Sequence, residues 1–119
     1  MSKSRLNYNN LAPTFSSLKG LNARSSFPFE QILRGNKSLG YFLQNRGYPN
    51  YPSPNHPSPG SDSYLSGDYI LKIYGSKFGG EVDAVQVGSG SPLLQSEGLA
   101  EYAKQLASAI KEFMDVHQY

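Results

Sequence analysis

The stretch SEGLAEYAKQLASAIKEFMDV, residues 96–116, has the most regular pattern in the chain. Apolar side chains recur in it at spacings of three and four residues, which is the period of an amphipathic helix. These side chains are Leu99, Tyr102, Ala103, Leu106, Ala107, Ile110, Phe113 and Met114. We predict one long helix whose apolar face is turned toward the core. A helix that binds a partner along this face is the alternative.

Upstream of this helix, residues 82–87 (VDAVQV) alternate between apolar and polar side chains and are rich in valine. Glycines bound the segment on both sides, so we predict a β-strand there. Residues 64–74 are ambiguous. Their aliphatic and aromatic side chains favour a strand, whereas the Ser-Gly-Asp lead-in at residues 66–68 would also cap a helix.

The first half of the chain predicts two short helices, within residues 27–35 and 38–47. Pro28 suits the first position of a helix, and the Ser38 hydroxyl is a candidate N-cap. Gly47 can adopt the left-handed conformation that ends a helix. Residues 48–66 hold five of the eight prolines, which predicts an extended, proline-rich loop.

Composition limits the chemistry that the chain can perform. It has 119 residues, enough for one small domain, and it contains no cysteine. Disulfides, thiolate zinc sites and cysteine nucleophiles are therefore excluded. No apolar run approaches the roughly 18 residues that a membrane-spanning helix needs, and no signal-peptide core is present. We therefore expect an intracellular protein, cytoplasmic or organellar.

Charge is distributed unevenly along the chain. Residues 1–48 carry seven Lys or Arg residues and one Glu, whereas residues 49–119 carry four Lys and eight acidic residues. Residues 1–26 contain no acid, which predicts a basic N-terminal arm. Its candidate partner-binding residues are Lys3, Arg5, Lys19 and Arg24. The basic residues form no cluster and no aromatic RNA-binding motif accompanies them, so we expect a protein partner rather than nucleic acid.

Four segments, taken in order, carry a resemblance to a known family. They are LRG (33–35) with SLG (38–40), RGY (46–48) with PSP (52–54), YLSGDY (64–69) with YG (74–75), and VDAVQV (82–87). Their order and spacing resemble the C-terminal half of the N-formylglutamate amidohydrolase family. The resemblance implies that residues 27–119 form part of an α/β, three-layer fold like that of the zinc exopeptidases. Short helices, one central strand and the long C-terminal amphipathic helix would make up this part.

The family hydrolyses an amide with one divalent metal, and its His and Glu ligands lie in the half that has no counterpart here. The resemblance places Gly88 where the family has Glu, and a related Glu acts as general base in the exopeptidases. It also implies a vestigial substrate pocket at Tyr69, Lys72, Tyr74 and Gly88, in which Lys72 keeps a positive charge. We therefore expect no catalytic residue, no metal and no cofactor.

These inferences lead to a non-catalytic structural or accessory subunit of a larger protein assembly, with other protein chains as partners. Two alternatives stay open. The chain could form one half of a split metal-dependent N-acyl amino acid amidohydrolase, or it could be a small domain that binds an anionic ligand.

Overall fold

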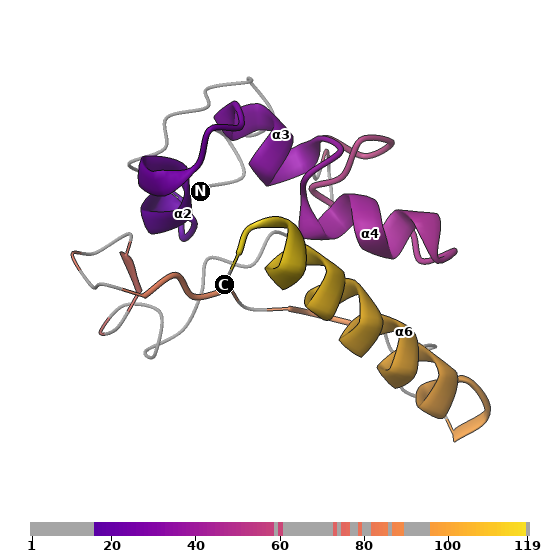
Figure 1. Ribbon diagram of the computed structural model, residues 1–119. Coiled ribbons are helices and arrows are strands. Elements are labelled where there is room, and N and C mark those ends of the chain that lie inside the picture. The colour runs from indigo at the N-terminus through magenta and orange to yellow at the C-terminus, as the bar shows by residue number, and fades with distance from the viewer. Residues whose placement is uncertain are drawn as a thin grey trace.

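A computed structural model describes residues 16–58, 60, 73, 75–76, 79, 82–85, 87–89 and 96–118. The helices of this part are α2 (Lys19–Arg24), α3 (Phe29–Arg34), α4 (Leu39–Asn45) and α6 (Ser96–Val116). The long helix α6 packs against α4, and α4 packs against α3 (Figure 1). The fold is thus a group of three short helices with one long helix along its side.

The ends of the short helices follow from their sequence. The Ser38 hydroxyl accepts a hydrogen bond from the Tyr41 backbone N–H at 3.1 Å, so the predicted N-cap of α4 is confirmed. Gly47 has a φ of 87°, the left-handed conformation predicted for the residue that follows this helix. Pro28 directly precedes α3 as its N-cap residue, one position before the predicted one.

The bounds predicted for the long helix, residues 96–116, are those of α6. The apolar spacing, together with Glu97 in the first turn, is therefore enough to predict this helix. The face that it buries carries Tyr102, Ala109 and Phe113, which are each less than a tenth exposed. These side chains anchor α6 on the rest of the chain.

The predicted α/β fold is wrong. Helix accounts for 53% of the described residues and extended structure for 3%, with no sheet among them. The extended structure in this part is one isolated parallel bridge between Gly75 and Val82. A three-layer fold needs a sheet between its helical layers, so the described part of the chain does not form one.

The central strand predicted at residues 82–87 is also wrong for the residues of this segment that the structure describes. Val82, Val85 and Val87 are exposed by 66%, 51% and 43%. Valine favours a strand because it packs well on a half-buried pleated surface, and that preference depends on neighbouring strands. The described residues provide no neighbour beyond the single bridge, so those of this segment form no strand.

The core is built from the facing sides of all four described helices. It consists of Leu18, Leu21, Ile32, Phe42, Leu43, Ala109 and Phe113, with Phe27, Leu39, Tyr41, Leu106 and Val116 packed around it. Leu21 and Ile32 are the largest apolar side chains that are fully buried. Because Leu18 and Leu21 belong to the predicted basic arm, the second half of that arm contributes to the core.

Residues 48–58 of the proline-rich loop are held by hydrogen bonds from buried polar side chains. The Ser53 hydroxyl is fully buried and donates to the Asn50 carbonyl at 2.6 Å, and it accepts from the His56 backbone N–H. The guanidinium of Arg34 on α3 donates to the Pro57 carbonyl at 3.1 Å. These bonds give the loop one fixed course across α3 and α4.

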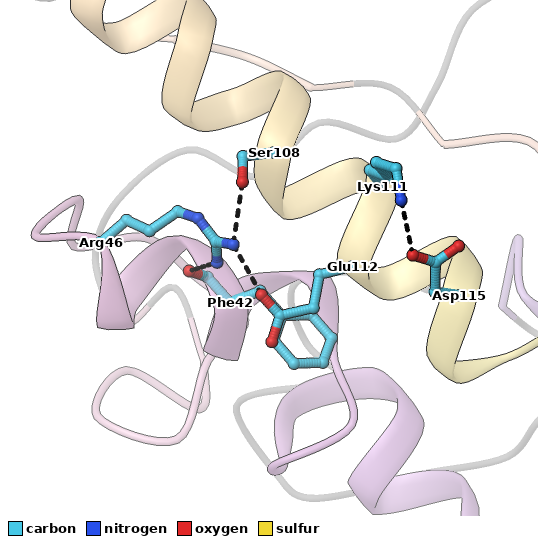
Figure 2. A network of polar contacts seen from close by, with 6 residues as sticks. All are labelled: Phe42, Arg46, Ser108, Lys111, Glu112 and Asp115. Atoms are coloured by element: carbon cyan, nitrogen blue, oxygen red, sulfur yellow. Dashed lines mark hydrogen bonds and ion pairs between the residues drawn. The ribbon is translucent and has the colours of Figure 1, made fainter.

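A polar clamp joins α4 to α6 on the surface (Figure 2). The Arg46 Nη2 group donates to Glu112 Oε2 at 2.6 Å and to Ser108 Oγ at 3.1 Å. Its Nη1 group donates to the Phe42 carbonyl at 2.9 Å. One guanidinium thus satisfies an orphan carbonyl in the last turn of α4 and orients the middle of α6.

The start of α2 is fixed by two side chains that are far from it in the sequence, Ser76 and Asp83. The Gly20 backbone N–H donates to Asp83 Oδ1 at 2.9 Å and to Ser76 Oγ at 3.0 Å. A carboxylate at this position also suits the positive end of the helix dipole. Residues far apart in sequence are therefore joined at the first turn of α2.

Candidate functional site

The structure describes one of the four residues predicted to line a vestigial substrate pocket. Gly88 is exposed and lies at the edge of a groove of about 530 Å³. Tyr69, Lys72 and Tyr74 lie outside the described residues. The predicted pocket therefore stays a prediction. The properties of the groove beside Gly88 depend on its described lining residues.

The groove lies between α3, α4, the start of the proline-rich loop and α6, with Val85 and residues 87–89 along one side. Its described walls are apolar, apart from hydroxyl and amide groups. The Asn50 amide is already used, because it donates to the carbonyls of Gly40 and Tyr48. The hydroxyls of Ser89 and Tyr102 are hydrogen-bonded to each other, and the Tyr102 ring meets the edge of Tyr48 with centroids 5.2 Å apart.

No charged side chain is among the described residues that line this groove. The described walls thus offer neither a base for proton transfer nor a cation for an anionic ligand. Within the same part of the chain, no three His, Asp or Glu side chains gather into a metal-binding group. The groove is thus a mainly apolar, uncharged gap between packed elements.

His117, directly after α6, is a buried imidazole. It is 4% exposed, and its Nε2 lies 2.6 Å from the Lys37 carbonyl, to which it donates. Its Nδ1 is buried and has no hydrogen-bond partner among the residues that the structure describes, and its ring meets the edges of Phe27 and Phe113. Burial lowers the pKa of His117 below its ordinary value of 6.5, and the nearby charges of Arg24 and Lys37 lower it further, whereas the bond to the Lys37 carbonyl opposes them.

This arrangement predicts a loss of stability in mild acid. Because the folded-state pKa of His117 lies below the unfolded value, the stability it contributes is present above about pH 6.5 and is lost as the pH falls below it. The unfolding free energy, measured by urea titration between neutral pH and about pH 5, should fall less steeply in His117→Gln than in the wild type. His56→Gln, at an exposed histidine, is the control and should keep the wild-type slope. Equal slopes for His117→Gln and wild type would contradict the prediction.

The second notable surface is the outer side of α6. Leu99, Ile110 and Met114 are exposed by 42%, 38% and 44%, and Ala103 and Ala107 between them are exposed as well. At about 100° per residue these five side chains form one continuous stripe beside the buried face. We call them the outer stripe. It extends about 22 Å along the helix, at 1.5 Å per residue.

Two lysines border the outer stripe on the side away from the core. Lys104 and Lys111 are seven residues apart, so they lie above one another two turns apart. Both are exposed, and Lys111 Nζ donates to Asp115 Oδ2 at 2.9 Å. Figure 2 shows Lys111 and Asp115 on a different side of α6 from the Arg46 clamp. Lys111 and Asp115 therefore take no part in the Arg46 clamp, which lies next to the border at Ser108.

Two of the four candidate partner-binding residues of the basic arm fall within the described part, and they differ in their surroundings. Lys19 is exposed on α2. Arg24 Nη1 donates to the His117 carbonyl at 2.8 Å and so joins the end of α2 to the end of α6. The other two candidates, Lys3 and Arg5, lie outside the described residues. Partner binding by these four residues stays a prediction.

The outer stripe could have been recognised from the sequence by the width of the apolar arc on α6. Tyr102, Ala109 and Phe113 lie on one side of the helix, whereas Ala103 and Ala107 lie well round from them. A helix that buries one face against a small core needs only the narrower arc. The apolar side chains outside this narrower arc are exposed, as expected if the helix binds a partner protein.

No protein-family model, curated protein or solved structure matches this chain. The resemblance to the C-terminal half of the N-formylglutamate amidohydrolase family therefore stays a prediction. Among the described residues, no helix is long and apolar enough to cross a membrane.

Proposed function

We propose that this chain is a non-catalytic accessory subunit that docks on a larger protein through the outer stripe of α6. The observation that carries the proposal is the exposure of Leu99, Ile110 and Met114 along one side of a helix whose other side is buried. Single exposed apolar side chains are ordinary on a protein surface, but a continuous apolar strip marks an interaction site.

The spacing of the outer stripe matches a known way in which helices bind proteins. A helix that lies in an apolar groove uses anchors three, four and seven positions apart. Ala103, Ile110 and Met114 follow this spacing, and Leu99 extends it by one turn. Burial of apolar surface stabilises association by roughly 25 cal/mol per Å², so the three large side chains would supply most of the affinity.

The non-catalytic part of the proposal is supported by the surroundings of Gly88. Glycine has no group that could take up a proton, and the described walls of the neighbouring groove carry no charge. These walls equally lack a cation for an anionic ligand, and Lys72, the cation of that alternative, lies outside the described residues. The split amidohydrolase has no observation in its favour among the described residues.

The proposal is tested by replacing the large residues of the stripe together, as Leu99→Ser, Ile110→Ser and Met114→Ser. The tagged chain is expressed in its native cells, cross-linked and sized by chromatography. We expect the wild type to elute in an assembly of defined stoichiometry and the triple variant to elute at the 13.1 kDa of the free chain. Far-UV circular dichroism of the purified variant checks that the helices persist.

Val82→Ser is the matched control, because Val82 is 66% exposed and lies outside α6. We expect it to stay in the assembly. A wild-type chain that elutes as a free monomer, or a triple variant that stays in the assembly, would contradict the proposal.

A further inference from the structure

We infer that the segment covering the outer stripe is an amphipathic helix of a partner protein, with a pair of acidic residues seven positions apart beside its apolar face. This inference rests on the proposed function and names the chemistry of the partner. The observation that supports it is the charge along the border of the stripe, where Lys104 and Lys111 lie in the middle turns of α6.

The border has a definite order of charge along α6. Its two ends are acidic, at Glu97 and Asp115, and its centre is basic, at Lys104 and Lys111. All four residues are exposed. Side chains flanking an apolar seam set partner choice, because they face the flanking positions of the partner helix. A partner that approaches the centre of the border with two carboxylates therefore meets opposite charge.

Both lysines can serve such a partner. Lys104 makes no ion pair with any described residue. The pair between Lys111 and Asp115 joins side chains that are 78% and 67% exposed, so it contributes little. If Lys111 exchanges Asp115 for a carboxylate of the partner protein, the attraction between the two charges becomes stronger. The reason is that the effective dielectric constant falls as the interface closes and excludes water. The acidic Glu112 is not free in this way, since it is held in the clamp to Arg46.

A second copy of the chain is a poor occupant of the stripe. Leu99 and Met114 lie at the two ends of the stripe. An antiparallel pair of α6 helices would therefore place Leu99 of one copy beside Met114 of the other. The same two-fold symmetry places Lys104 within two residues of the position opposite Lys111 of the copy, and Glu97 within one residue of the position opposite Asp115 of the copy. Like charges directly opposed across an interface oppose association. The border therefore selects a different chain that carries acid at its centre.

Residues 16–58 add attraction of the same sign. They carry five Lys or Arg residues and one Glu, whereas α6 itself carries two Lys and four acidic residues. A positive surface raises the rate at which an acidic segment is captured, in a way that salt suppresses. The contact itself is still assigned by the two lysines that border the stripe.

The test uses two labelled synthetic helices of about 18 residues, long enough to form several turns. Both have a leucine stripe. One carries glutamates seven positions apart beside it, and the other carries lysines at the same positions. Fluorescence anisotropy with the full chain at low salt should show saturable binding of the glutamate peptide, about tenfold tighter than the lysine peptide. In the variant Lys104→Glu with Lys111→Glu, the preference should reverse.

Ser26→Glu with Asn36→Glu is the control, since it adds two negative charges at exposed positions outside α6 and should keep the wild-type preference. Equal binding of the two peptides, or a change with this control as large as with the α6 variant, overturns the inference. If neither peptide binds while the triple stripe variant still leaves its assembly, the acidic helix is wrong and the proposed function stands. A stable dimer of the wild type in sedimentation, lost in the triple variant, would assign the stripe to a second copy and overturn the inference.

Discussion

Phe113→Ala is expected to lower the unfolding free energy by about 3–5 kcal/mol, the usual result of removing a buried aromatic ring. The Phe113 side chain is 8% exposed and lies in the core between α6 and the short helices. Its ring also meets the edge of the His117 ring, with centroids 4.5 Å apart. The substitution therefore leaves a cavity and removes one of the walls around a buried imidazole.

The measurement is urea unfolding followed by circular dichroism at neutral pH. Met114→Ala is the matched control, because Met114 is the next residue of α6 and is 44% exposed. We expect its effect to be within about 0.5 kcal/mol, as for most surface substitutions. If Phe113→Ala does not fold, Phe113→Leu keeps much of the volume and gives a measurable loss. Equal effects of Phe113→Ala and Met114→Ala would show that α6 is not anchored through this face.

The contrast between these neighbours shows how far the pattern of α6 could be predicted. Spacings of three and four residues determine a helix and its bounds, because they are properties of the local chain. They do not determine which part of a wide apolar arc is covered, because that depends on the size of the surface it packs on. The core of the described residues is narrow, so it buries Phe113 and leaves Met114 and Ile110 outside. The candidate site, the outer stripe, is the part of the apolar arc that the core does not cover.

The wrong strand at residues 82–87 has a different cause. Its valines have the right local preference, but a strand is stabilised by pairing with a neighbour, which the segment itself does not specify. The role of Asp83 was equally hidden. Its carboxylate accepts a hydrogen bond from the first turn of α2, sixty-three positions away. A local sequence pattern does not predict such a contact. Leu18 and Leu21 entered the core by the same long-range packing.

Gly40→Ala is expected to lower the unfolding free energy by about 1–3 kcal/mol, because the site has no room for a methyl group. A Cβ atom on Gly40 would lie 2.0 Å from the Pro52 carbonyl oxygen and 2.8 Å from Asn50 Oδ1. The first of these is a backbone atom, so rotation of a side chain does not relieve the clash. The first turn of α4 and the proline-rich loop must move apart, which also strains the hydrogen bond from Asn50 to the Gly40 carbonyl.

The chain contains its own control for this substitution. Gly98 lies in the first turn of α6, and a Cβ there would meet nothing within 4 Å. Gly98→Ala should therefore be neutral or stabilising by up to about 1 kcal/mol, the ordinary preference of a helix for alanine over glycine. The two variants make the same chemical change in two helices and are expected to shift the urea midpoint in opposite directions. A Gly40→Ala midpoint at or above that of Gly98→Ala would mean that the proline-rich loop does not rest on α4. The groove bounded by these two elements would then lose one of its walls.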